Sequence, residues 1–463
     1  MKRAFSQVLT AAQMRAAEQA LIGAGTGVSE LMERAGRGAA DWVRRVAVGR
    51  PVTVLCGPGN NGGDGYVIAR ALREAGLAVR VVAPLPPATD AARAAQAAWG
   101  GGTGTLARGG VLVDALFGTG LARPLGTALA ELLCAAAREH EFRIAIDLPS
   151  GIDADRGEPL DDGLPPFDLT LSLGAWKPAH WRMPAMTAMG ERRLVDIGIE
   201  RVAGAARLLS RPVLHSPAIG AHKYTRGFVG VVGGAMPGAG QLAAEAAMHG
   251  GAGYVKLFAD AWPSQPSPEL VVEGGDLRDV VADRRLDVLL VGPGLGRGEV
   301  SHQRLAAALA RELPTVVDGD ALMLLDPALL SGRREGLVLT PHAGELAALY
   351  RALEIEAADP LERLRALAHD ARAVVIAKGP DTVIAAPDGA LTFTTGAPSW
   401  LSIAGSGDVL AGLVASRIAA GRTLFAAAEE AVWLHGRAAR IAGPAFAPRG
   451  LIAALPPAIS ECL

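Results

Sequence analysis

Two glycine-rich segments place polar side chains between an expected strand and an expected helix. The first, GPGNNGGDG, begins at the end of the apolar run PVTVLCG (51–57) and carries Asn60, Asn61 and Asp64. Glycines let the backbone approach a ligand closely, and N–H groups at a helix start favour an anion such as a pyrophosphate. The segment matches neither the dinucleotide-binding register nor a Walker A motif. A turn without a ligand would not need these polar side chains, so the pattern favours a ligand site.

Asp114 and Asp147 each end an apolar run, in GVLVDALFG and RIAIDLPSG. Either aspartate alone could be the N-cap of a helix. Two of them at the ends of strands, one followed by GTGLARP and the other by LPSGID, favour a functional role. Carboxylate, amide and hydroxyl oxygens together could hold a hard cation, and a carboxylate beside a bound ligand could shuttle a proton.

The second glycine-rich segment is GSGDVLAG (405–412), in which a turn leads into a helix with Asp408 in its first turn. The turn and the helix dipole can hold a phosphate. Asp408 could be a favourable first-turn acid. An aspartate beside a phosphate is better explained as a base that activates a hydroxyl for phosphoryl transfer.

Two further motifs follow expected strands. Lys378 in KGPDT is one of five lysines among 45 basic residues, and it could reach a nucleotide phosphate as a point charge. In TPHAGEL, His342 could be a core histidine or a ligand contact, and Glu345 could orient Mg²⁺ or cap a helix.

Strands alternate with helices in both halves, which predicts an α/β fold with parallel sheets. Residues 207–222 hold two prolines and no clear hydrophobic period, and the halves share no repeat. We therefore expect two different domains, 1–210 and 211–463.

Composition narrows the function classes. The 463 residues are 50% hydrophobic with a net charge of −2 and no basic stripe, so a nucleic-acid partner is not expected. No uninterrupted apolar run is long enough for a membrane span, and the N-terminus lacks a signal-peptide pattern. Three scattered cysteines disfavour zinc and disulfide frameworks and fit a reducing cytoplasm.

Five ordered motifs within about residues 5–205 resemble the NAD(P)H-hydrate epimerase family: LMERAG, GPGNNGGDGYVIAR, VDALFGTGLARP, IDLPSGIDAD and SLGAWKPAH. The resemblance implies a Rossmann-like three-layer fold and interconversion of the R and S epimers at C6 of hydrated NADH or NADPH. It implies substrate contacts at Asn60, Asn61, Gly62, Gly63, Asp64, Gly118, Thr119, Gly120, Leu121, Ala122, Arg123, Pro124 and Asp147. It implies K⁺ ligands at Asn61, Asp114 and Ser150, with Asp147 as the candidate acid/base. Lys177 matches a family lysine, although we expect it at the surface.

Motifs in about residues 218–460 resemble the ADP-dependent NAD(P)H-hydrate dehydratase family: HKYTRGFVGVVGG, MPGAG, GPGLG, VVDGDAL, TPHAGEL, KGPDT and GSGDVLAG. The resemblance implies a ribokinase-like three-layer fold. It implies contacts with the hydrated cofactor at Ala239, Gly296, His342 and Asp408, and contacts with ADP and its Mg²⁺ around Lys378, Gly379, Pro380, Asp381, Thr382 and Gly407. Phosphoryl transfer to the C6 hydroxyl would turn it into a good leaving group, and Asp408 would take its proton. Ser406 stands where the family commonly has Thr, and the run 224–226 puts the local loop geometry in doubt.

Together the resemblances predict a bifunctional metabolite-repair enzyme, in which the first domain converts the R epimer into the S epimer that the second dehydrates. One alternative is a ribokinase-like kinase of a vitamin precursor, fused to a nucleotide-binding domain. Another is an N-terminal RNA- or protein-binding scaffold, which the neutral charge and the oxygen-rich 60–64 cluster disfavour. We expect a cytoplasmic protein that forms a homo-oligomer, since exposed Ala-rich helices allow assembly.

Overall fold

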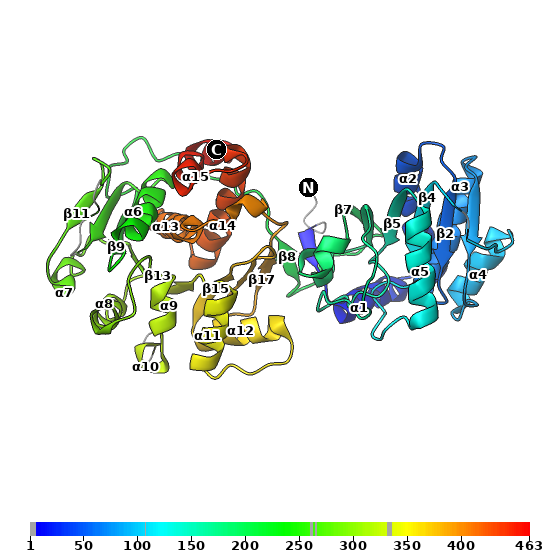
Figure 1. Ribbon diagram of the computed structural model, residues 1–463, viewed down its shortest axis with the longest axis horizontal. Helices are drawn as coiled ribbons and strands as arrows, with labels where there is room; N and C mark the ends of the chain where they lie inside the picture. The colour runs from blue at the N-terminus through cyan, green and yellow to red at the C-terminus, as the bar shows by residue number, and fades with distance from the viewer. Residues whose placement is uncertain (1–5, 107, 260–262, 264–265, 331–335) are drawn as a thin grey trace. The chain divides into compact units, whose positions relative to one another are not determined.

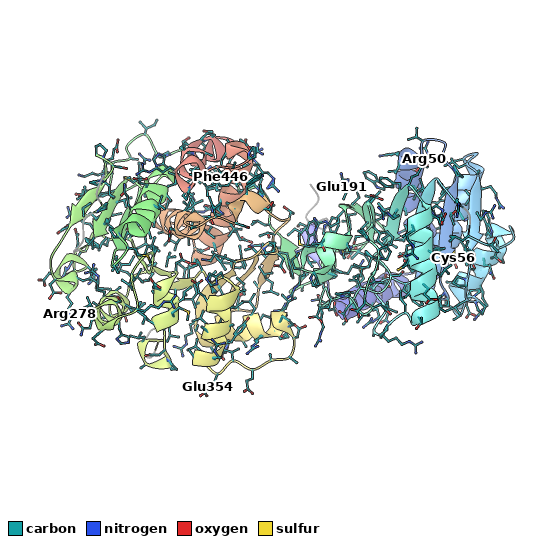
Figure 2. All side chains as sticks on the ribbon, in the orientation of Figure 1. Arg50, Cys56, Glu191, Arg278, Glu354 and Phe446 are labelled. Carbon is teal, nitrogen blue, oxygen red and sulfur yellow. The ribbon has the colours of Figure 1, made fainter. Side chains whose placement is uncertain are left out.

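The chain folds into two compact units, Met1–Leu208 and Leu209–Leu463, in a computed structural model that describes residues 6–106, 108–259, 263, 266–330 and 336–463 (Figure 1). Side chains fill the space between the layers of each unit (Figure 2). Among the described residues, no helix has the length and apolar character needed to cross a membrane.

The first unit is built on a parallel sheet in the order β3-β2-β4-β5-β6-β7. Its strands are β2 (Val52–Cys56), β3 (Val79–Val82), β4 (Val111–Ala115), β5 (Phe142–Ile146), β6 (Leu169–Leu173) and β7 (Glu191–Val195). A short antiparallel pair joins β1 (Gln7–Val8) to β8 (Ala206–Leu208). The strands β2, β4 and β6 are buried throughout because helices cover both faces of the sheet.

The helices of this unit are α1 (Ala11–Gly23), α2 (Val28–Ala47), α3 (Asn60–Glu74), α4 (Asp90–Trp99) and α5 (Thr127–Glu139), followed by the short turns η2 (Pro178–Trp181) and η3 (Ala185–Ala188). Residues of α1 to α4 pack with one face of the sheet, and α5 packs with the other through Leu133 and Ala136. The predicted α/β class is therefore confirmed, with three layers.

One prediction about this unit is wrong in detail. The sequence suggests a loop over GPGNNGGDG, yet α3 already begins at Asn60. The glycines of this segment lie in the first turns of α3, where nearby residues of the same chain leave no room for a larger side chain. A Cβ on Gly62 would lie 1.8 Å from the carbonyl oxygen of Gly57, and one on Gly63 would lie 2.6 Å from the sulfur of Met32. Close helix–strand packing therefore explains part of the glycine pattern.

The second unit holds the strand order β17-β16-β15-β14-β13-β12-β9-β10-β11, in which neighbours from β15 to β11 are parallel and β15, β16 and β17 are antiparallel. The strands are β9 (Phe228–Val232), β10 (Tyr254–Phe258), β11 (Val271–Glu273), β12 (Val288–Val291), β13 (Thr315–Val317), β14 (Leu337–Leu339), β15 (Ala373–Ala377), β16 (Val383–Ala385) and β17 (Leu391–Phe393).

Helices cover both faces of this second sheet (Figure 1). One face carries α6 (Pro237–His249), α13 (Ser406–Ala419), α14 (Leu424–Ala442), α15 (Pro448–Ala453) and α16 (Leu455–Ser460), which form a continuous apolar core with the strands. The remaining helices are α7 (Leu277–Val280), α8 (Glu299–Leu309), α9 (Asp320–Leu324), α10 (Pro327–Leu330), α11 (Ala343–Ala352) and α12 (Pro360–Asp370), and the short turn η4 (Ser399–Leu401) precedes α13. The loops after the parallel strands meet at one edge, where open α/β sheets bind ligands.

Candidate active sites

In the first unit, Asp147 directly follows β5 and adopts a left-handed backbone conformation with φ of 66°. The N–H of Leu148 bonds across it to the carbonyl of Ile146 at 2.9 Å, which makes a tight three-residue turn. A non-glycine residue in this conformation is strained and persists only where its surroundings hold it. The strain therefore points to a functional reason for an aspartate here.

Four donors surround the Asp147 carboxylate. Its Oδ1 accepts from the N–H of Leu173 at 3.2 Å and from the Lys177 ammonium, and its Oδ2 accepts from the N–H of Thr119 at 3.0 Å and from the Thr119 hydroxyl. Burial alone would raise the pKa of this carboxyl, but Lys177 and Thr119 together hold the pKa below its usual value. Asp147 is therefore an ionised carboxylate in the resting protein.

The expectation that Lys177 lies at the surface is wrong. Its side chain is only 1% exposed, and its ammonium also donates to the carbonyl of Leu173 at 2.8 Å. The cause is η2, which turns the chain after β6 back over the sheet edge. Trp176 and Trp181 pack edge-to-face there, and both rings are buried.

His180 completes this corner from η2. Its Nδ1 accepts from the N–H of Lys177 at 2.9 Å, and its Nε2 lies 2.8 Å from the carbonyl oxygen of Asp147. Burial lowers the pKa of the imidazole to about 4, so a neutral ring with the proton on Nε2 satisfies both contacts. His180 thus fixes the strained backbone of Asp147.

Two more carboxyl groups lie near the Lys177–Asp147 pair. Burial raises the pKa of Asp64 well above its ordinary value, and the nearby charges of Asp147 and Glu18 raise it further. Burial also raises the pKa of Glu18 on α1, against the opposing effect of Lys177. The Lys177–Asp147 ion pair thus has two neighbours, Asp64 and Glu18, whose raised pKa values favour their protonated forms.

A possible cation site lies beside this cluster. Asp114 is fully buried at the end of β4. Its Oδ1 accepts from the Ser150 hydroxyl at 2.8 Å and its Oδ2 from the Ser150 N–H at 2.9 Å. The donors that contact it, from Ser150 and the N–H of Leu116, are neutral, and burial raises its pKa to about 6. Asn61 comes to the same corner from α3, where its amide donates to the carbonyl of Ile146 at 3.3 Å. One carboxylate with neutral oxygens suits a hard cation of low charge.

The other predicted substrate residues fall into two groups. Gly118 and Thr119 lie against Asp147, since a Cβ on Gly118 would be 3.0 Å from Oδ2 of Asp147 and 3.2 Å from Oδ1 of Asn61. The adjoining segment 120–124 forms a largely exposed turn. Asn60 points elsewhere, because its side chain accepts a hydrogen bond from the Thr89 hydroxyl at 2.8 Å. The structure thus gathers Asn61, Gly118 and Thr119 around Asp147 and leaves Asn60 outside.

In the second unit, α13 begins at Ser406, after Gly405 with φ of 90°. The carbonyl of Ser406 bonds to His435 Nε2 at 3.0 Å, and burial lowers the pKa of His435 to about 4. Asp408 lies in the first helical turn, and burial raises its pKa to about 7, with the like charge of Asp318 adding to the shift. A carboxyl group tuned to neutral pH beside a helix N-terminus suits a general base.

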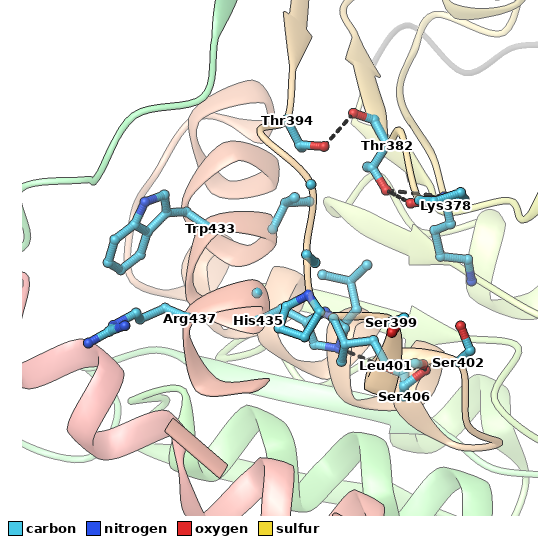
Figure 3. Close-up of a pocket in the computed structure, with 18 of the residues that line it drawn as sticks. Lys378, Thr382, Thr394, Ser399, Leu401, Ser402, Ser406, Trp433, His435 and Arg437 are labelled. Atoms are coloured by element: carbon cyan, nitrogen blue, oxygen red, sulfur yellow. Dashed lines mark hydrogen bonds between the residues drawn. The ribbon is translucent and has the colours of Figure 1, made fainter. Parts of the chain in front are cut away.

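A cavity of about 910 Å³ opens beside this helix start. Lys378, Gly379, Pro380, Thr382 and Gly407 of the predicted nucleotide site line it; Asp381 is not among its lining residues. Figure 3 shows Lys378 at one end of the cavity and Trp433 and Arg437 of α14 at the other. The KGPDT turn is closed on itself, since the Thr382 hydroxyl donates to the carbonyl of Gly379 at 2.7 Å. The cavity is large enough for a nucleotide.

His342 and Glu345 cap α11 reciprocally. His342 Nδ1 accepts from the N–H of Glu345 at 3.2 Å, and Glu345 accepts from the N–H of His342 at 2.8 Å. Of the two roles considered for Glu345, the structure shows the cap. The His342 side chain is 62% exposed and also lines the cavity, so it is not a core histidine.

The remaining predicted contacts are Ala239, in the first turn of α6, and Gly296, on the neighbouring loop after β12. A Cβ on Gly294 would lie 3.0 Å from the Cβ of Ala239, and one on Gly296 would lie 3.2 Å from the Cβ of Ala235. The N–H of Gly296 donates to Asp320, whose charge also raises the pKa of Asp408. Ala239, Gly296 and Asp408 therefore converge at one edge of the sheet.

Several residues of these sites were not singled out from the sequence: Glu18, His180, Asp318, Asp320, Trp433, His435 and Arg437. The two aspartates lie in the VVDGDAL motif and Lys177 and His180 lie in SLGAWKPAH, so a closer reading of those motifs could have found them. Glu18, Trp433 and His435 lie on ordinary amphipathic helices, where the sequence carries no signal that separates them from their neighbours.

Comparison with known proteins finds families and relatives that match both units. Residues 229–461 match the family model described as NAD(P)H-hydrate dehydratase, and residues 28–179 match the model described as YjeF-related protein N-terminus. The bifunctional NAD(P)H-hydrate repair enzyme Nnr of Gloeobacter violaceus is 36% identical, over 92% of this chain and 92% of that protein. The protein of the same name from Coxiella burnetii is 33% identical, over 95% of this chain and 96% of that protein.

A solved structure resembles the second unit. The crystal structure of a ribokinase-like superfamily protein from Enterococcus faecalis superposes with a TM-score of 0.50 and 25% sequence identity. The match covers 57% of this chain and 98% of that chain. The predicted ribokinase-like fold is confirmed.

Proposed function

The chain belongs to the family of bifunctional NAD(P)H-hydrate repair enzymes, and from that premise we propose which unit performs each reaction. The first unit epimerises hydrated NADH or NADPH at C6, and the second dehydrates the S epimer at the expense of ADP. The observation that supports this division is that each unit carries its own carboxylate, Asp147 or Asp408, at the carboxyl edge of its own parallel sheet. The predicted bifunctional repair activity agrees with the family, and the kinase alternative is disfavoured.

In the first unit, we assign the proton transfer to Asp147 and its buried partner Lys177. Loss of the C6 hydroxyl breaks the C6–O bond, and the ring-nitrogen lone pair forms a C=N bond. The leaving oxygen needs a proton, which Asp147 passes from the Lys177 ammonium through the hydrogen bond between them. Water returning to the opposite face gives one proton back, so the step is balanced. The carboxylate also stabilises the positive charge on the ring.

We propose that Asn61, Asp114 and Ser150 hold K⁺ in this unit. The fit rests on the fully buried Asp114 carboxylate, whose hydrogen-bond partners are neutral. A cation there would supply the missing positive charge and would fix the turn that carries Ser150 beside Asp147. Its role in the reaction would be electrostatic.

In the second unit, Asp408 takes the proton of the C6 hydroxyl, whose oxygen attacks the terminal phosphorus of ADP. The bond from that phosphorus to its bridging oxygen breaks and AMP leaves. The C6–O bond of the ester then breaks, C5 gives up a proton to the departing phosphate, and the C5=C6 bond of NADH or NADPH forms. In this proposal the N–H groups at the start of α13 and the Lys378 ammonium bind the phosphates, which is supported by Lys378 and Gly407 lining the same cavity. Mg²⁺ bound with the nucleotide would neutralise charge on the transferred group.

An absorbance assay at 340 nm tests the proposal. A mixture of both epimers of hydrated NADH is incubated with the full chain, with and without ADP. Complete conversion only with ADP supports both activities, and conversion that stops when the S epimer is used up means that the first unit does not epimerise. ATP-dependent phosphorylation of an alcohol, without conversion of hydrated NADH, would favour the kinase alternative. A cytoplasmic location and a homo-oligomer stay predictions, which fractionation and analytical ultracentrifugation test.

A further inference from the structure

The Asp318-Gly319-Asp320 turn lies between the two halves of the dehydratase site. It links β13 to α9, and Gly319 adopts φ of 54° and ψ of −126°. The carbonyl of Asp318 approaches so closely that a Cβ on Gly292 would lie 1.6 Å from it. The turn is therefore fixed against the 292–297 loop, and its two aspartates serve different neighbours.

Asp318 faces the predicted nucleotide site. Its Oδ1 accepts from the Lys378 ammonium at 2.7 Å and from the Thr340 hydroxyl at 2.6 Å, and its side chain is only 4% exposed. A Cβ on Gly407 would lie 3.3 Å from Lys378 Nζ and 4.0 Å from Asp318 Oδ2. A lysine is a flexible point charge, so this buried carboxylate determines where the ammonium rests beside the start of α13.

Asp320 faces the loop that carries Gly296. Its Oδ2 accepts from the N–H of Gly296 at 2.9 Å, and its Oδ1 accepts from Nε of Arg297 at 2.7 Å. Gly296 has φ of 82°, one of several conformations open to a glycine, and the bond from its N–H to Asp320 holds the loop in this one. The same loop abuts Ala239 on α6 through Gly294. Asp320 thus shapes the side of the cleft assigned to the hydrated cofactor.

We propose that Asp318 and Asp320 are positioning residues with separate tasks: Asp318 sets the affinity for the adenine nucleotide through Lys378, and Asp320 sets the affinity for the hydrated cofactor through the loop at Gly296. This inference rests on the proposed dehydratase function of the second unit. Both charges raise the pKa of Asp408, but the two side chains hydrogen-bond to different groups, so their effects on the two KM values are separable.

Asp318→Asn and Asp320→Asn in the full chain test this division by steady-state kinetics. We expect Asp318→Asn to raise KM for ADP about tenfold and to leave KM for the hydrate within about twofold of the parent value. Asp320→Asn should do the reverse. Asp326→Asn is the matched control. Asp326 lies six residues after Asp320 and caps α10 by accepting from the N–H of Leu329, and an asparagine can form the same cap.

Calorimetric titration with ADP gives a second readout that needs no turnover. If Asp318 acts through Lys378, Lys378→Met and the double variant Asp318→Asn/Lys378→Met should bind ADP equally weakly, whereas independent roles would make the losses add. Thr340→Val removes one hydrogen bond to Asp318 and keeps its charge. This variant replaces Asp318→Asn in the test if Asp318→Asn does not fold. We expect Thr340→Val to lower the affinity for ADP about threefold.

Equal effects of both aspartate substitutions on both KM values, in proteins that melt like the parent, would overturn the division of tasks. So would unchanged ADP affinity in Asp318→Asn or, where that variant does not fold, in Thr340→Val. A parent protein that binds ADP but never forms NADH from the hydrate would instead refute the proposed dehydration, and the ADP titrations would still decide the role of Asp318.

Discussion

Lys177 and Asp147 form a buried ion pair at the carboxyl edge of the first sheet, with side chains only 1% and 9% exposed. An ion pair in such a place costs free energy of desolvation, which good geometry and further hydrogen bonds must offset. Asp147 has those further bonds, from Thr119 and Leu173. A buried, fully paired carboxylate in contact with Thr119 of the predicted substrate loop is costly to build, and that cost argues for a catalytic use.

Lys177→Met should abolish epimerisation and lower the free energy of unfolding by about 3–5 kcal/mol, because it leaves a buried carboxylate without its cation. Lys177→Met/Asp147→Asn should recover part of that stability without recovering activity. Chemical denaturation and an NMR assay of epimer exchange measure the two effects. Arg37→Met is the control, since its ion pair with Glu74 is half exposed and worth less than about 1 kcal/mol. Full epimerase activity in Lys177→Met would remove the lysine from the mechanism.

Substitutions in one unit should spare the reaction of the other. We expect Asp147→Ala to slow epimerisation by about 10²–10⁴-fold, as for loss of a general acid/base, while dehydration of pure S epimer keeps its rate. Asp408→Ala should abolish dehydration and leave epimerisation intact. Separate assays of both reactions on each variant measure this. A substitution that abolished both reactions in a folded protein would contradict two independent sites.

The sequence predicts the two α/β units and the polar residues at their strand ends, because those positions carry glycine turns and isolated acids inside apolar runs. It does not predict that Lys177 is buried. That burial depends on how η2 folds Trp176 and Trp181 over the sheet edge, which is a packing outcome with no local signal. The start of α3 at Asn60 is also missed, because glycine is a poor helix former and only close packing against Gly57 and Met32 makes it suitable there.

Potassium should stabilise the first unit. If Asn61, Asp114 and Ser150 hold the ion, replacing K⁺ by tetramethylammonium should lower the melting temperature and the epimerase rate, since the buried Asp114 carboxylate then lacks a cation. Asp114→Asn should remove this dependence on K⁺ because the substituted amide has no charge to balance. Differential scanning calorimetry in the two salts is the measurement. The dehydratase rate of Asp114→Asn is the internal control, and an undiminished K⁺ effect in this variant would exclude Asp114 as a ligand.

Dehydration should respond to pH through Asp408. The group acts as a base only when it has lost its proton, and its pKa is raised to about 7. The kcat/KM of the ADP-dependent reaction on S epimer should therefore rise about tenfold per pH unit below that value and level off above it. Asp326→Asn, which changes the cap of α10, should keep this profile because Asp326 is not among the charges that shift the pKa of Asp408. A rate independent of pH between 5 and 8 would contradict the assignment of Asp408 as the base.

The raised pKa of Asp408 also predicts that stability falls with rising pH, whereas the dehydration rate rises. Unfolding returns the carboxyl to its ordinary pKa of 3.8, so the unfolded chain loses this proton at lower pH than the folded protein does. Stability is therefore lost as pH rises from about 4 to about 7, and the deficit is constant above that. Asp408→Asn removes the buried charge and should raise the free energy of unfolding at pH 8 by up to about 4 kcal/mol, since one pKa unit corresponds to about 1.4 kcal/mol. Near pH 4 the variant and the parent should have nearly equal stability. Thermal melts of both proteins without nucleotide, at the two pH values, measure this difference, and equal stability at pH 8 would mean that the folded protein ionises Asp408 without cost.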